Sequence, residues 1–157
     1  MVANFEIGES DYESIDDFPL KWRWTDERWN VLPAMALQSI QPLKKAKAKE
    51  LLHYSLTFSD INGLIPGLFV KEEQTDASVE SEVVQTWLKL KGPEHNFKVV
   101  VSWTDELAVL VTWEVFCKYW DDFCYPGSDD VALFPLAGDW VLLYDHAECF
   151  IFGDRTH

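Results

Sequence analysis

The fold is decided by the run Val99-Val100-Val101-Ser102-Trp103, which is followed by a polar corner at 104–106 and a second apolar run at 107–112. Both runs are rich in β-branched residues, and two such runs joined by a short polar corner predict a β-hairpin. Three more short apolar runs follow, at 131–134, 140–144 and 149–152. We expect these segments to form one sheet in the last third of the chain.

A helix is expected between the hairpin and the last three strands. Trp113, Phe116, Cys117 and Trp120 are spaced i, i+3, i+4 and i+7, which is the pattern of one buried helix face. Thr112 precedes them and is a favoured residue for the N-cap. The last third is therefore predicted to run ββαβββ.

The chain before residue 97 carries mainly helical patterns. Apolar residues recur at helical spacing in 42–55 and 79–88, and less regularly in 27–39, where Pro33 allows either one helix or two short turns. Residues 20–24 alternate apolar and basic side chains and predict a short strand. Residues 71–78 are polar and acidic and predict a flexible segment.

The order of these elements predicts an α+β fold. N-terminal helices would be followed by a ββαβββ segment that forms a mainly antiparallel sheet, with helices packed on one side. We expect residues 1–157 to be a single domain, because no linker or internal repeat interrupts them. Residues 1–19 are acidic and irregular, and we expect a loosely attached arm there.

Composition indicates a folded chain outside the membrane. The 157 residues are 48% hydrophobic and include eight tryptophans, which is enough to build a core. No apolar run reaches the roughly 18–20 residues that a membrane span requires. The first residues lack the basic and apolar regions of a signal peptide, so we expect a cytoplasmic protein.

The charge of the chain is strongly negative, at −14. It argues against nucleic acid as a partner, because nucleic-acid binding needs basic groups on the phosphates. From residue 104 onward, eleven acidic side chains are balanced only by Lys118 and Arg155. This field either keeps the protein soluble or steers it toward a basic partner. The lysines at 44, 45, 47 and 49 either face water or pair with these acids.

Motifs for catalysis or cofactor binding are absent from the sequence, and we expect no cofactor. Cys117 and Cys149 lie in apolar patterns and are expected to be core residues. The turn that contains Asp145, His146 and Glu148 resembles part of a metal site, but zinc needs three or four converging ligands. We expect no metal, and keep a small metal-dependent or hydrolytic enzyme that uses this turn as the alternative function.

Paired carboxylates are the remaining candidate site. One pair ends the aromatic helix, where carboxylates oppose the helix dipole, and a second pair precedes the next strand. Two acids of a later turn could join them in one patch. The predicted partner-binding residues are Asp121, Asp122, Asp129, Asp130, Asp145 and Glu148. The pairs could instead face water separately.

The run from Thr112 to Pro126, with Ser128-Asp129-Asp130-Val131 and the pattern Glu148-x-Phe150-x-Phe152-Gly153, resembles a family of small uncharacterised bacterial proteins. Some proteins of this kind are candidate immunity partners of polymorphic toxins. The resemblance covers the last third and Ile40-Gln41-Pro42-Leu43, and it supplies no catalytic residues.

These observations give two hypotheses and a third, neutral one. The first is an acidic cytoplasmic binding protein, an immunity-type inhibitor that is not an enzyme and that occludes a basic partner such as a cognate toxin. Exposed aromatic side chains would anchor it. The second is the enzyme named above, and the third is a housekeeping protein. The sequence leaves the oligomeric state open.

Overall fold

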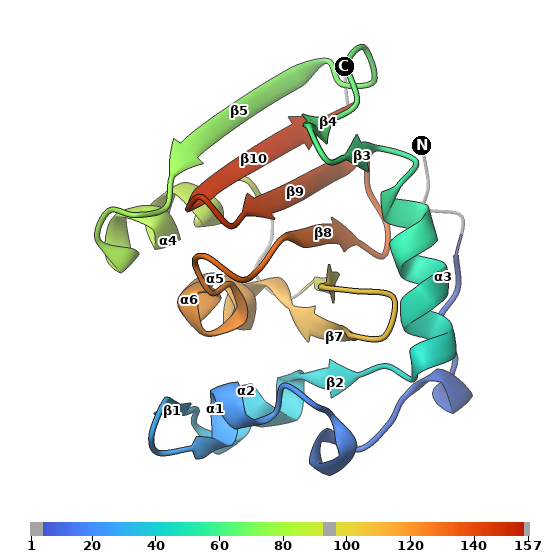
Figure 1. Cartoon of the computed structure of the whole chain (residues 1–157), viewed down its shortest axis with the longest axis vertical. Coiled ribbons are helices and arrows are strands. Elements are labelled where there is room, and N and C mark those ends of the chain that lie inside the picture. The colour runs from blue at the N-terminus through green and yellow to red at the C-terminus, as the bar shows by residue number, and fades with distance from the viewer. Residues whose placement is uncertain (1–4, 93–96, 156–157) are drawn as a thin grey trace.

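The computed structural model describes residues 5–92 and 97–155, which are built around a seven-stranded sheet. The strands are β2 (Gln41–Pro42), β5 (Lys71–Asp76), β6 (Lys98–Ser102), β7 (Ala108–Thr112), β8 (Val131–Pro135), β9 (Trp140–Asp145) and β10 (Cys149–Asp154). Their order across the sheet is β2-β7-β6-β8-β9-β10-β5, and all these neighbours are antiparallel (Figure 1). The predicted α+β class with a mainly antiparallel sheet is confirmed.

The ββαβββ order of the last third is also confirmed. β6 and β7 form the predicted hairpin, and the helical segment between β7 and β8 consists of α5 (Trp113–Lys118) and α6 (Trp120–Phe123). The hydroxyl of Thr112 accepts a hydrogen bond from the backbone N–H of Val115, as expected of an N-cap. The expected single helix is divided at Tyr119, whose backbone leaves the helical conformation.

The remaining helices cover both faces of the sheet, and not one face as we expected. These helices are α1 (Trp22–Thr25), α2 (Ala34–Ser39), α3 (Lys45–Ser55) and α4 (Ser81–Lys89). Residues of α1, α2, α4, α5 and α6 share one core, whereas residues of α3 pack in a second core on the opposite face. Figure 1 shows α3 opposite α4, α5 and α6. None of the helices in the described part of the chain is long and apolar enough to cross a bilayer.

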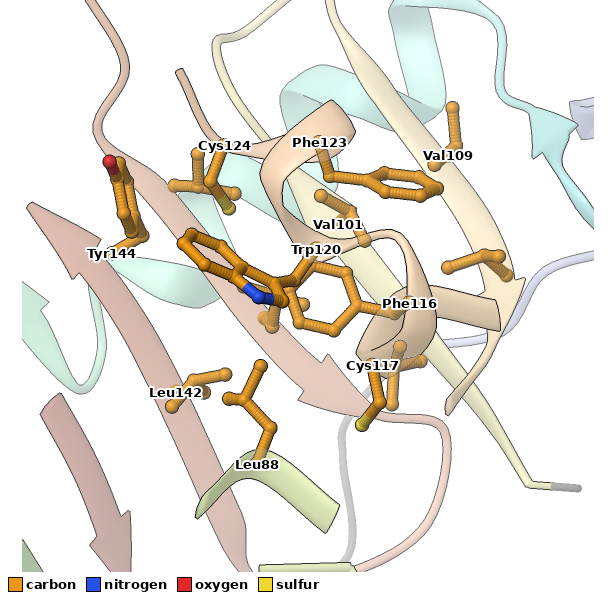
Figure 2. Packing of buried hydrophobic residues seen from close by; sticks show 14 of the residues in the cluster. Leu88, Val101, Val109, Phe116, Cys117, Trp120, Phe123, Cys124, Leu142 and Tyr144 are labelled. Carbon is orange, nitrogen blue, oxygen red and sulfur yellow. The ribbon is translucent and has the colours of Figure 1, made fainter. Parts of the chain in front are cut away.

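The larger core is aromatic and lies between α4, α5, α6 and the sheet. Figure 2 shows Trp120 in its middle, with Leu88 of α4 and Tyr144 of β9 nearby. The ring of Trp120 lies 5.5 Å from that of Phe150 on β10. Alternate strand residues point into this core because neighbouring side chains of a strand face opposite sides.

The second core covers only part of the opposite face. Tyr54 of α3 and Phe58 pack on Phe134 of β8, with ring centroids 4.9 and 5.7 Å apart. A small hairpin of β3 (Ser59–Asp60) and β4 (Gly63–Leu64) follows α3 and lies over β10. The face between this hairpin and the end of α3 stays open and forms a groove.

Three expectations for the first half of the chain were wrong. The segment 20–24, expected as a strand, overlaps helix α1, and Gln41–Pro42 forms strand β2, although helical spacing was expected from residue 42 onward. Residues 71–76 form strand β5, which pairs along its length with β10. β5 is an edge strand, so its backbone hydrogen-bonds to a neighbouring strand on one side only. Its polar side chains do not prevent this pairing.

The N-terminal segment is fastened to the sheet at several points. The backbone N–H of Glu13 donates to Pro42, and that of Lys44 donates to Asp11. Phe18 is buried and stacks on Trp24 at 5.8 Å. These contacts of residues 5–19 differ from the loosely attached arm that we expected, and residues 1–4 lie outside the described part.

Candidate functional site

The predicted partner-binding acids lie on both sides of the turn at 125–128. The N–H of Gly127 donates to the carbonyl of His146, so this turn lies against the β9–β10 turn. Asp121 and Asp122 belong to α6 on one side. Asp130, Asp145 and Glu148 lie at the ends of β8, β9 and β10 on the other side.

Asp129 is buried, so it cannot belong to an exposed patch. Its carboxylate accepts two hydrogen bonds from the guanidinium of Arg23, at 2.6 and 3.1 Å, and a third from the N–H of Tyr125. Both side chains are less than a tenth exposed. The pair fixes α1 to the chain before β8, which is a structural role.

Three aromatic rings form a surface cluster next to α6, which we call the aromatic corner: Trp22, Trp29 and Tyr125. Trp29 is exposed, whereas Trp22 and Tyr125 are half-buried. The ring of Trp22 lies 4.9 Å from Trp29 and 5.7 Å from Tyr125. Trp29 is 58% exposed, and the guanidinium of Arg23 lies 4.0 Å from the Tyr125 ring centre. The rings are therefore held in place and accessible to a partner.

Asp122 ties the aromatic corner to α6. Its carboxylate accepts a hydrogen bond of 2.8 Å from the side-chain amide of Asn30, the residue after Trp29. Its backbone carbonyl accepts one from the indole of Trp24. Burial raises the pKa of the Asp122 carboxyl, and the charge of Asp121 adds to this effect. Asp121 itself is exposed, so it places a negative charge beside the aromatic corner.

The second surface is the groove on the α3 face. An acidic row lies at one end of the groove and crosses β5, β10, β9 and β8. Asp76 of β5 pairs with Cys149 of β10, which pairs with Asp145 of β9. Asp130 directly precedes β8 and lies beside Asp145. Directly opposed residues of an antiparallel pair point to the same face, so these side chains share the face of the groove.

An apolar row forms the floor of the groove, next to the acidic row. Cross-strand pairing places Ile151, Leu143, Ala132 and Ser102 side by side. The walls come from the end of α3 and from the β3–β4 hairpin, through Leu52, Leu56 and Ile61. The groove is open to solvent and has a volume of about 520 Å³, which is within the range of small-molecule sites.

His146 closes the acidic end of the groove. Its Nδ1 lies 3.0 Å from an Asp130 oxygen, and its backbone N–H donates to the same oxygen. This hydrogen bond and the charges of Asp130 and Asp145 raise the pKa of the imidazole. One potential metal-binding atom from each of these three residues lies within 4.8 Å of the others.

The metal site predicted from Asp145, His146 and Glu148 has a different set of residues in the structure. Asp130 joins Asp145 and His146 in the candidate metal cluster, whereas Glu148 does not. Glu148 lies in the turn with a positive φ of 63°, which the tight β9–β10 connection requires. The sequence offered Asp130 as a neighbour of this turn, and the pairing of β8 with β9 brings it there.

The cysteines do not provide an activated nucleophile. Burial raises the pKa of Cys117 to about 12, and it also raises that of Cys124. Cys149 is half-buried, and burial together with Asp145 and Asp76 raises the pKa of its thiol. A raised pKa keeps a thiol protonated and unreactive at neutral pH.

Comparison with known proteins gives no assignment of this chain. No protein-family model, no curated protein and no solved structure matches it. The functional argument therefore rests on the two surfaces described above.

Proposed function

We propose that this chain is an acidic cytoplasmic binding protein, an immunity-type inhibitor that occludes a basic partner protein such as a cognate toxin. The observation that carries the proposal is the aromatic corner, in which Trp22 and Tyr125 hold the exposed ring of Trp29 at the surface, near the charge of Asp121. The resemblance of the last third to candidate immunity proteins points in the same direction.

The aromatic corner has the chemistry of a protein-binding hot spot. Tryptophan, tyrosine and arginine dominate the binding energy of interfaces, because they bury large areas with little loss of side-chain freedom. The mutual packing of Trp22, Trp29 and Tyr125 restricts their rotamers before a partner arrives. Val31 and Met35, which follow in the chain, are 52% and 83% exposed and would extend the apolar contact.

The negative charge of the chain favours a basic partner. The protein carries a net charge of −14, so a basic surface is attracted at long range and phosphate groups are repelled. Asp121 lies at the edge of the contact, where charges mainly change the association rate. Inhibition would follow from occlusion, as when an acidic protein covers the basic active site of a nuclease toxin.

Affinity capture from the source cells tests this proposal. The tagged wild-type chain should retain one basic protein at low salt and release it in a salt gradient. Trp29→Ala should lose this protein, whereas Leu56→Ala should retain it. Leu56 is a matched control, because it is 55% exposed but lies at the groove. Equal retention by both variants would remove the aromatic corner as the binding site.

The inhibitory role needs a separate measurement. The purified basic partner should lose its toxic activity on addition of the wild-type chain and keep it on addition of Trp29→Ala. A partner that binds at the aromatic corner without any loss of activity would leave a binding protein that is not an inhibitor.

A second candidate function, a small metal-dependent enzyme, is favoured by one observation. Asp130, Asp145 and His146 offer three ligand atoms close together, although the acids are partly exposed and no fourth ligand joins them in the described residues. Zinc titration followed by calorimetry tests it. Saturable binding of one ion that disappears in Asp145→Asn would support this function, and its absence would remove it.

A further inference from the structure

Ser102 is a buried polar group without a partner, on the floor of the groove. The residue is 2% exposed, and its Oγ has no hydrogen-bond partner within the described structure. A buried hydroxyl without a hydrogen bond costs free energy, so such a group requires an explanation, and a bound molecule that supplies the hydrogen bond is one. The other two serines of the groove differ, since Ser55 and Ser59 donate to backbone carbonyls.

The acidic end of the groove has three carboxylates against a single imidazole. Among the lining residues, Asp60, Asp130 and Asp145 carry negative charge, and His146 is the one titratable base. Lysine and arginine are absent from this lining. A ligand with a positive charge would therefore complement the groove, and an anion would be repelled.

The arrangement of the rows fixes the shape of such a ligand. Asp145 and Leu143 are two residues apart on β9, so about 6–7 Å of strand separates the acidic row from the apolar row. Ser102 lies two strands from Leu143, which is roughly 10 Å across the floor. The site thus offers a charged end, an apolar middle and a polar far end.

We propose that this groove binds a small aliphatic ammonium compound. The ammonium group lies against Asp130 and Asp145, the alkyl chain lies on Leu143 and Ala132, and a polar group at the far end bonds to Ser102. This site is separate from the aromatic corner, so it does not depend on the proposed inhibitor function.

A series of ligands with the same alkyl chain tests the charge preference. Hexylamine, hexanol and hexanoate are titrated into the full chain while backbone amide shifts are recorded. We expect saturable binding with shifts at Ser102, Ala132, Leu143 and Ile151. Hexylamine should bind at least about tenfold more tightly than hexanoate, and its affinity should fall as salt is added.

Two variants assign the ends of the ligand. Asp130→Asn with Asp145→Asn should remove the preference for hexylamine but leave hexanol binding unchanged, because asparagine can keep the backbone hydrogen bonds that both carboxylates accept. Asp121→Asn is the matched control and should behave as wild type. Ser102→Ala should lower the affinity for 6-amino-1-hexanol about threefold or more relative to the affinity for hexylamine.

Several results would overturn the proposal. Equal affinity for hexylamine and hexanoate would remove the role of the acidic row. Shifts that map to another surface would remove the groove as the site. Zinc binding at His146 without saturable binding of hexylamine would assign the acidic row to a metal instead.

Discussion

Arg23 and Asp129 form a buried, two-point ion pair between segments that are 106 residues apart in the sequence. The pair joins α1, which carries Trp22 of the aromatic corner, to the chain that leads into β8. Tyr125 packs against the same guanidinium. The position of the aromatic corner on the sheet therefore depends on this ion pair.

Removal of either partner should destabilise the fold strongly. Arg23→Ala or Asp129→Ala leaves a buried charge without its partner, so each should lower the free energy of unfolding by about 3–5 kcal/mol. The double variant should lose less free energy of unfolding than the two single variants lose together. Urea unfolding measures these values. Arg28→Ala, which removes a surface ion pair with Asp26, is the control and should leave the urea unfolding curve nearly unchanged.

Gly153 should not tolerate a side chain. A methyl group at this position would lie 2.7 Å from Phe69 and 2.8 Å from Leu64, which belong to the loop and hairpin above β10. Gly153→Ala should cost about 1–3 kcal/mol, because these side chains must move. In Gly8→Ala the added methyl group would meet only an ordinary contact with Asp11, at 3.8 Å, so this variant should be nearly neutral. Equal thermal stability of the two variants would contradict the close packing of the hairpin on β10.

His146 should make stability depend on pH through Asp130. Asp130 raises the pKa of His146 in the folded state. The stabilisation of the fold by this interaction is therefore complete below the unfolded-state pKa of about 6.5. The contribution is lost as pH rises through the folded-state pKa. Asp130→Asn should therefore lower the imidazole pKa in an NMR titration. The stability difference between this variant and wild type should shrink from pH 5 to pH 9, and a difference that grows would contradict this assignment.

The thiols should react slowly in the native protein. Cys117 has a pKa of about 12 and Cys124 is buried, so a thiol reagent at pH 8 should leave both unmodified. Cys149 is half-buried and should react first, but more slowly than free cysteine. All three should react in denaturant. Mass spectrometry after timed labelling checks this order, and early modification of Cys124 would contradict the packing of α6.

The sheet was predictable because its strands are local patterns. Residues 99–102 of β6 and 108–111 of β7 alternate between two buried faces, and the resulting β-rich runs are visible without any knowledge of their partners. β5 was missed because its side chains are polar, and only the backbone pairing with β10 defines it. α1 was mistaken for a strand because Arg23 looks like a surface residue in the sequence, whereas Asp129 neutralises it inside the protein.

The candidate site was predictable only in part. The sequence shows that Asp121, Asp130 and Asp145 are acidic, but their distribution over two surfaces follows from strand pairing and from the turn at 125–128. The groove is a long-range feature, because its floor combines residues from β6 to β10. No local pattern relates Ser102 to Ile151, so sequence reasoning could not find this site.

Hydroxyl-radical footprinting of the chain bound to its captured partner tests the central claim most directly. Trp29, Met35 and Tyr125 have side chains that oxidise readily, and Trp29 and Met35 are well exposed in the free chain. We predict that binding protects Trp29 and Tyr125 by at least about fivefold while Ile61, which is 99% exposed at the groove, stays unprotected. Unchanged oxidation of Trp29 together with protection of Ile61 would contradict the account.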